Sequence, residues 1–176
     1  MQKVRLFCYL LLCFSVPLTV YSKGVYQEPA DFIDEVFNGN PPEPDKLWLR
    51  GELKENIREI LGHDMDVLRL RYWLKDGRSV WILEEIGKER LITSGFVINE
   101  GSIEKVKVLV FREIRGWEVR YPFFTDQFKG AKLDEKKLLD RHIDGISGAT
   151  LSVNALTRLA QLALFLHSVV TQTGKD

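Results

Sequence analysis

The feature that most constrains the fold of this 176-residue chain is a series of short alternating segments between residues 67 and 112. Apolar and polar side chains alternate over 67–74, the pair Asp76-Gly77 follows, and 79–85 returns with strand-forming residues. An Asp-Gly pair between two alternating segments is a strong signal for a tight hairpin turn. The sequence therefore predicts an antiparallel β-hairpin over 67–85.

Two more segments, 90–98 and 103–112, have the same strand character and are joined by the short polar stretch 99–102. Residues 117–121 are a candidate for a fifth strand. Consecutive strands with short connections pair in order along the chain, so we expect an antiparallel meander.

Helical patterns flank the predicted strands. The spacing of apolar residues predicts helices over 29–37 and 47–61, with Gly62 placed where a left-handed C-terminal cap belongs. Residues 38–44, which contain three prolines, are interpreted as a linker. We expect residues 23–63 to form a helical N-terminal arm, with a Pro-rich linker, that packs on the main body.

The pattern of apolar residues over 151–170 predicts a long C-terminal helix whose polar side chains occupy one narrow stripe. A transmembrane interpretation is disfavoured by Arg158, Gln161 and His167 within so short a run. A helix buried along one face of the sheet fits better. The expected fold class is therefore α+β, an antiparallel β-meander packed by a long C-terminal helix.

The first 22 residues have the pattern of a secretory signal peptide. Lys3 and Arg5 precede an apolar run that extends to Val20, and Ser22 is a small residue suited to the cleavage site. The run is shorter than the roughly 20 residues that cross a bilayer. We expect residues 1–22 to be removed on export, and an uncleaved single-span anchor is the alternative.

Charge and cysteine placement exclude several function classes. The 25 basic and 25 acidic residues give no net charge, so the composition lacks the excess of basic residues that is typical of nucleic-acid-binding proteins. Both cysteines, Cys8 and Cys13, lie in the predicted signal peptide, and the three histidines have no metal-ligand spacing. We therefore expect no metal site, and any redox chemistry would need an organic cofactor.

The segment Asp144-Gly145-Ile146-Ser147-Gly148-Ala149-Thr150 carries the candidate chemistry. Ser147 is expected to be the N-cap of the C-terminal helix, with Gly148 and Ala149 in its first turn. Small side chains there let a ligand approach the free N–H groups, which favour an anion such as phosphate. The alternative is a Ser-capped core helix that binds nothing.

This segment resembles the flavinylation motif Asp-x-x-Ser/Thr-Gly-Ala-Thr of the FMN-binding domain family, which includes flavin-bearing subunits of sodium-pumping NADH:quinone oxidoreductase. The resemblance implies that Thr150 holds FMN through a phosphoester and that Ser147, Gly148 and Ala149 surround the cofactor. It implies that Asp144 and Gly145 belong to the sequence recognised by a flavin transferase, which takes FMN from FAD with a divalent metal.

The resemblance extends over residues 64–170. Glu113 falls where the family has Glu-Thr-Pro-Gly, and Phe128-Lys129-Gly130 is similar to its Gln-Phe-x-Gly segment. The chain departs from the family where Ile114-Arg115-Gly116 replaces Thr-Pro-Gly, so contacts to the flavin ring are not carried over. The expected division is a signal peptide over 1–22, an arm over 23–63, an FMN-binding domain over 64–170 and a tail over 171–176.

The resemblance implies an exported electron carrier rather than a stand-alone enzyme, in the periplasm or at the outer face of the cytoplasmic membrane. Its expected partners are a flavin transferase and a redox donor and acceptor, which could be membrane proteins. Two alternatives remain open: a non-redox binding or assembly module of the same fold, and a flavin reductase with its own small substrate.

Overall fold

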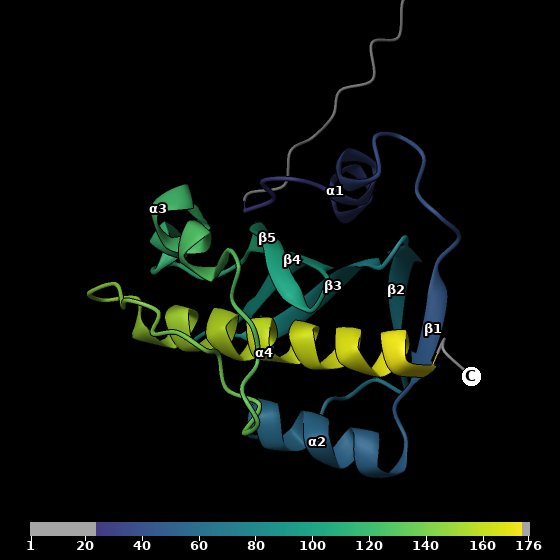
Figure 1. Ribbon diagram of the computed structural model, residues 1–176. Helices are drawn as coiled ribbons and strands as arrows, with labels where there is room; N and C mark the ends of the chain where they lie inside the picture. The colour runs from purple at the N-terminus through teal and green to yellow at the C-terminus, as the bar shows by residue number, and fades with distance from the viewer. Residues whose placement is uncertain (1–23, 174–176) are drawn as a thin grey trace, which may run out of the picture.

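The computed structural model describes residues 24–173, so the predicted signal peptide and the last three residues lie outside the described part of the chain. Five antiparallel strands pair in the order β1-β2-β3-β4-β5, and the helix α4 crosses one face of this sheet (Figure 1). The α+β meander with a long C-terminal helix is therefore confirmed. The strands are β1 (Asp45–Trp48), β2 (Arg69–Lys75), β3 (Arg78–Ile86), β4 (Leu91–Asn99) and β5 (Ser102–Phe111).

The helices follow the same chain order. The α-helices are α1 (Pro29–Val36), α2 (Gly51–Leu61), α3 (Pro122–Thr125) and α4 (Thr150–Thr173), and the short 3-10 helices are η1 (Trp117–Arg120) and η2 (Asp126–Phe128).

The tight turns form where the sequence predicts them. Asp76 and Gly77 both have positive φ angles, of 52° and 75°, which is the backbone required at the two central positions of a type I′ hairpin turn. Gly62 also has a positive φ, of 81°, and ends α2 as the predicted left-handed cap.

Two predicted elements are wrong. Residues 45–48 form the edge strand β1 rather than helix, with Leu47 opposite Leu70 of β2, and α2 begins only at Gly51. Residues 117–120 form a 3-10 turn rather than a strand. A strand there has no free edge to join, because residues 24–26 hydrogen-bond along β5: the N–H of Tyr26 donates to Leu109 O over 2.8 Å.

The two faces of the sheet are covered by different helices. α4 and α2 pack on one face, where Trp81, Phe96 and Leu159 are fully buried. α1 packs on the other face, over β3 to β5, with Phe32 at its centre. Gly95 makes this second contact possible, because a Cβ at that position would lie only 2.4 Å from the Phe32 ring.

α4 is long and apolar enough, by length and composition, to cross a membrane. In this fold, however, 67% of its most apolar window is buried inside the protein. This helix is therefore the core helix of a globular fold, as the interrupted apolar pattern predicts.

A buried hydrogen-bonded group joins α4 to the sheet. His167 Nδ1 lies 2.8 Å from Ser79 Oγ, which also accepts a 2.9 Å bond from Trp81 Nε1. The N–H of Gly101 donates to His167 Nε2, so the ring is neutral, with its proton on Nδ1. Burial lowers the pKa of His167, because the charged ring would be poorly solvated there.

Shortening a core side chain of α4 tests the importance of its packing. Leu159 is completely buried, so Leu159→Ala should lower the free energy of unfolding by about 2–5 kcal/mol. Leu68→Ala is the matched control, because Leu68 is 79% exposed and its truncation opens no cavity. Urea unfolding of both variants gives the comparison, and equal stabilities would show that α4 is not a core helix.

The buried histidine predicts a specific pH dependence of stability. Because the pKa of folded His167 is lowered, the unfolded state binds a proton more readily as the pH falls below about 6.5. The free energy of unfolding should therefore decrease from neutral pH towards about pH 5, and His167→Gln should lose this part of the decrease. The raised pKa of His63 acts in the opposite direction in both proteins, so the difference between their urea-unfolding pH profiles isolates His167. Superimposable profiles would contradict the prediction.

Candidate functional site

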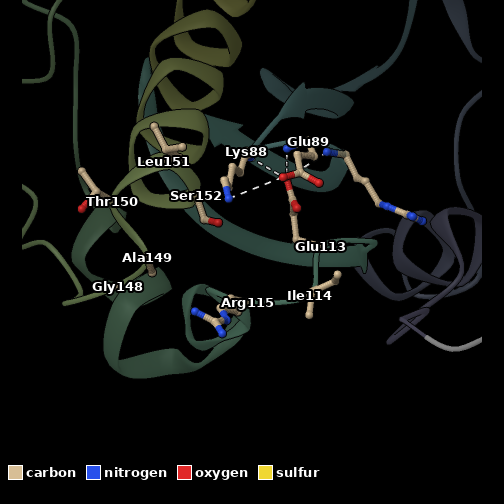
Figure 2. A pocket seen from close by; sticks show the side chains of 11 residues that line it. Lys88, Glu89, Glu113, Ile114, Arg115, Gly148, Ala149, Thr150, Leu151 and Ser152 are labelled. Carbon is tan, nitrogen blue, oxygen red and sulfur yellow. Dashed lines mark hydrogen bonds and ion pairs between the residues drawn. The ribbon is translucent and has the colours of Figure 1, made fainter.

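A surface pocket of about 470 Å³ lies where three separate segments of the chain meet. The turn between β3 and β4 contributes residues 88–90, the segment after β5 contributes residues 113–115, and the start of α4 contributes residues 148–152. Figure 2 shows these three groups of side chains around the opening. Its size falls within the range of small-molecule sites, roughly 300–1,000 Å³.

Glu113 joins two walls of this pocket. Its Oε1 atom accepts hydrogen bonds from the backbone N–H groups of Lys88, Glu89 and Arg90, over 2.5, 2.6 and 2.9 Å (Figure 2). Partial burial opposes ionisation of the carboxyl, but the N–H groups of Arg90, Glu89 and Lys88 outweigh it and keep the pKa of Glu113 below its ordinary value. The ionised Glu113 carboxylate therefore holds the β3–β4 turn in place through these hydrogen bonds.

Gly116 allows the segment after β5 to contact the start of α4. It has a positive φ of 82°, and a Cβ there would lie 2.8 Å from Ser152 Oγ and 3.4 Å from the Ala149 Cβ. Only a glycine lets this loop approach the first turn of α4 so closely. Gly116 is also the position at which the chain retains the last residue of the family's Glu-Thr-Pro-Gly segment.

The helix begins at Thr150, so the expected N-cap role of Ser147, with Gly148 and Ala149 in the first helical turn, is wrong. The Ala149 N–H donates to Ile146 O over 2.9 Å, and Gly148 has a φ of 83°, so residues 146–149 form a tight turn before the helix. The first helical bond runs from the Val153 N–H to Ala149 O, which places Ala149 at the N-cap position. Ser147 is instead exposed.

Thr150 is the first residue of α4 and its side chain is exposed. In Figure 2 it lies on the open side of the first turn, whereas Ser152 is directed towards Lys88 and Glu113. As the first residues of a helix, 150–152 have N–H groups with no carbonyl one turn earlier within the helix, so these groups are available to an anion. The Thr150 hydroxyl is thus both reachable and close to free donors.

Three basic side chains line the same pocket. Lys88 and Arg90 come from the β3–β4 turn and Arg115 follows Glu113. Lys88 lies 3.4 Å from Glu89, whereas the ion pairs found among residues 24–173 do not include Arg90 or Arg115. Because Glu89 and Glu113 also line the pocket, its charged side chains sum to one net positive charge, which together with the helix N-terminus favours a phosphate group.

Asp144 and Gly145 lie outside the pocket, on the exposed loop that leads into it. The Asp144 N–H donates to Gln127 Oε1 over 2.7 Å, while its carboxylate points outwards with 85% of the side chain exposed. No other residue comes within 4 Å of a Cβ added at Gly145. Their expected role in recognition by another protein stays a prediction, as do the cofactor contacts of Ser147, Gly148 and Ala149.

Sequence reasoning missed Lys88, Arg90 and Arg115 as site residues. The first two look like ordinary hairpin-turn residues, and only the pairing of β3 with β4 brings them near α4. Arg115 was noted only as a departure from the family. Within the described residues 24–173, no group of three His, Cys, Asp or Glu side chains could hold a metal ion.

These residues fit the phosphate end of FMN. The pocket offers a free hydroxyl on Thr150, available helix N–H groups and the positive charges of Lys88, Arg90 and Arg115. Gly148 leaves open space where a side chain would stand, so a phosphate can approach the backbone. The pocket is therefore suited to an anionic ligand that is tethered or held at the start of α4.

Comparison with known protein families supports an FMN-binding role for this pocket independently of its geometry. Residues 87–164 match the family model described as the FMN-binding domain, a stretch that includes β4, β5 and α4 as far as Leu164. No curated protein and no solved structure matches the chain. Residues 87–164 of this chain are therefore similar to the FMN-binding domain family, as the resemblance predicts.

Proposed function

We propose that this protein is an exported electron carrier that holds FMN covalently through a phosphoester on Thr150. The observation that carries the proposal is the exposed Thr150 at the first position of α4, which lines the same pocket as three basic side chains and lies within a segment that matches every specified residue of the flavinylation motif.

Attachment requires a partner enzyme. A threonine hydroxyl is a weak nucleophile at neutral pH, and none of the residues lining the pocket is a histidine that could serve as its base. We infer a flavin transferase that uses FAD and a divalent metal. The Thr150 Oγ forms a bond to the phosphorus of the FMN half, the pyrophosphate bond breaks, AMP leaves, and the hydroxyl proton passes to the transferase.

The exposed loop 144–148 suits this reaction. Asp144 projects a carboxylate into solvent six residues before the acceptor, and Gly145 and Gly148 leave the backbone uncovered. A transferase can therefore bind the loop without unfolding the helix. Asp144 and Gly145 belong to the recognised sequence in this proposal, and neither touches the flavin pocket.

After attachment, the residues of this chain hold the phosphodiester and orient the flavin. The N-terminal N–H groups of α4 and the cations of Lys88, Arg90 and Arg115 balance the negative charge of the phosphodiester. Glu113 keeps the Lys88–Arg90 turn in place. The bound flavin supplies one- and two-electron transfer, and a covalent link prevents its loss from an exported protein.

Changing the acceptor residue tests the covalent link. Thr150→Ala removes the Oγ atom but keeps a good helix former, so the fold should survive and covalent flavin should fall to zero. Thr150→Ser keeps a hydroxyl and should be partly labelled. The measurement is intact and peptide mass after co-expression with a flavin transferase, with one FMN-phosphoryl adduct, lacking AMP, expected on the wild-type peptide that contains Thr150.

Two further variants make this result specific. Ser152→Ala removes the hydroxyl of a neighbouring residue that is only 5% exposed, and it should leave labelling intact. Asp144→Ala should sharply reduce labelling without changing the melting temperature. An adduct that persists in Thr150→Ala would move the site to Ser147 or Ser152, and no adduct on the wild type with an active transferase would favour the non-redox binding module.

Export is tested separately from flavin attachment. The basic start, apolar run and Ser22 of the sequence predict cleavage after residue 22. N-terminal sequencing of protein recovered from the periplasm of a bacterial host should therefore begin at or near Lys23. A chain that still begins at Met1 and sediments with membranes would show that the segment is an anchor.

A further inference from the structure

One part of the sheet carries positive charge without a covering element. Lys46 and Trp48 of β1 lie opposite Arg71 and Arg69 of β2, so all four side chains project from the same face. This is the face that carries Trp73 and Val80, on which α1 packs. α1 packs on residues of β3, β4 and β5, and Figure 1 shows β1 and β2 at the end of the sheet away from β5. We call Lys46, Trp48, Arg50, Arg69 and Arg71 the basic strand face.

The cations of this face have no acidic partners. Within residues 24–173, the ion pairs found include none of Lys46, Arg50, Arg69 and Arg71, although Lys105 and Lys107 of the same sheet both pair with Glu35. The nearest carboxylate in sequence, Asp45, is occupied, because it accepts hydrogen bonds from the Tyr72 hydroxyl and the Lys46 N–H. Four basic side chains, all exposed, therefore remain available to an anionic partner.

An exposed tryptophan stands among these charges. The Trp48 side chain is 46% exposed, and the guanidinium carbons of Arg50 and Arg69 lie 5.0 and 5.3 Å from the centre of its ring. Such cation–π contacts stabilise the ring in this exposed position. Tryptophan side chains are enriched at the membrane–water interface, where adjacent arginines can reach the lipid headgroups.

The shape of the face also restricts its partner. None of its five residues lines the pocket at the start of α4 or any of four other pockets of the described residues. A small anion bound in one of these cavities is therefore a poor fit, whereas an extended, negatively charged surface can contact all of these exposed side chains. Arginine also binds phosphate oxygens through paired hydrogen bonds.

We propose that the basic strand face docks onto the anionic phospholipid headgroups of a bilayer, with Trp48 placed at headgroup depth. The lysine and arginines bind lipid phosphates while the sheet lies along the membrane surface. The residues of the flavin pocket come from other elements, so this inference holds whether or not Thr150 carries FMN.

Vesicle binding tests this inference. The full chain is mixed with vesicles of phosphatidylcholine alone or of equal parts phosphatidylcholine and phosphatidylglycerol, and bound protein is measured by sedimentation. The wild type should prefer the anionic vesicles, and this preference should weaken with added salt. The double variant Arg69→Gln, Arg71→Gln should bind them about thirtyfold more weakly, which corresponds to about 1 kcal/mol for each arginine.

The matched control is Lys132→Gln with Lys136→Gln, which removes the same charge from two exposed lysines outside the face and should bind like the wild type. Brominated phosphatidylcholine in the anionic vesicles should quench Trp48, measured as the difference between the wild type and Trp48→Phe. This second signal reports on the face itself, even if residues 1–22 also contact lipid.

Equal binding by the wild type and the arginine double variant, together with no quenching of Trp48, would overturn the proposal. So would arginine-dependent binding to soluble polyglutamate without binding to anionic vesicles, because the partner would then be an acidic protein. Melting temperatures of all variants should match that of the wild type, since the substituted side chains are exposed.

Discussion

Burial of α4 against the sheet is the contact on which the rest of the fold depends. The helix is apolar around most of its circumference, so it is stable in water only when the sheet and α2 cover it. Because this packing fixes where α4 lies along the sheet, it also fixes the position of the first residue of the helix. Thr150 stands at the end of the sheet where β3 turns into β4, and the site exists because the core holds the helix in this register.

The candidate site is assembled from backbone as much as from side chains. Glu113 bonds to three consecutive N–H groups of the β3–β4 turn, and Gly116 allows the next loop to touch the helix. Neither residue needs to contact a cofactor in order to matter for its binding. Their effect is to keep three cations and one helix terminus within a single pocket, where their attraction for a phosphate adds up.

The parts of the structure that could be predicted are those determined by residues close together in the sequence. The Asp76-Gly77 turn, the Gly62 cap and the buried C-terminal helix each follow from short-range rules, and each is found. The strand at 45–48 was missed because Leu47 and Leu49 suit helix or strand, and its pairing with β2 is a long-range contact. The pocket cations were missed for the same reason, since nothing near Lys88 or Arg90 in sequence indicates that α4 begins beside them.

The short bridge between Val25 and Val110 has a consequence for how copies of this protein meet. Residues 24–27 occupy the outer side of β5 with three main-chain hydrogen bonds, from Tyr26 and Gln27 to Leu109 and from Phe111 to Gly24. That part of the sheet border cannot accept a strand from another molecule. The opposite border, β1, is four residues long and carries Lys46, so it is a poor template as well. Pairing with a strand of another molecule is therefore disfavoured at both β5 and β1.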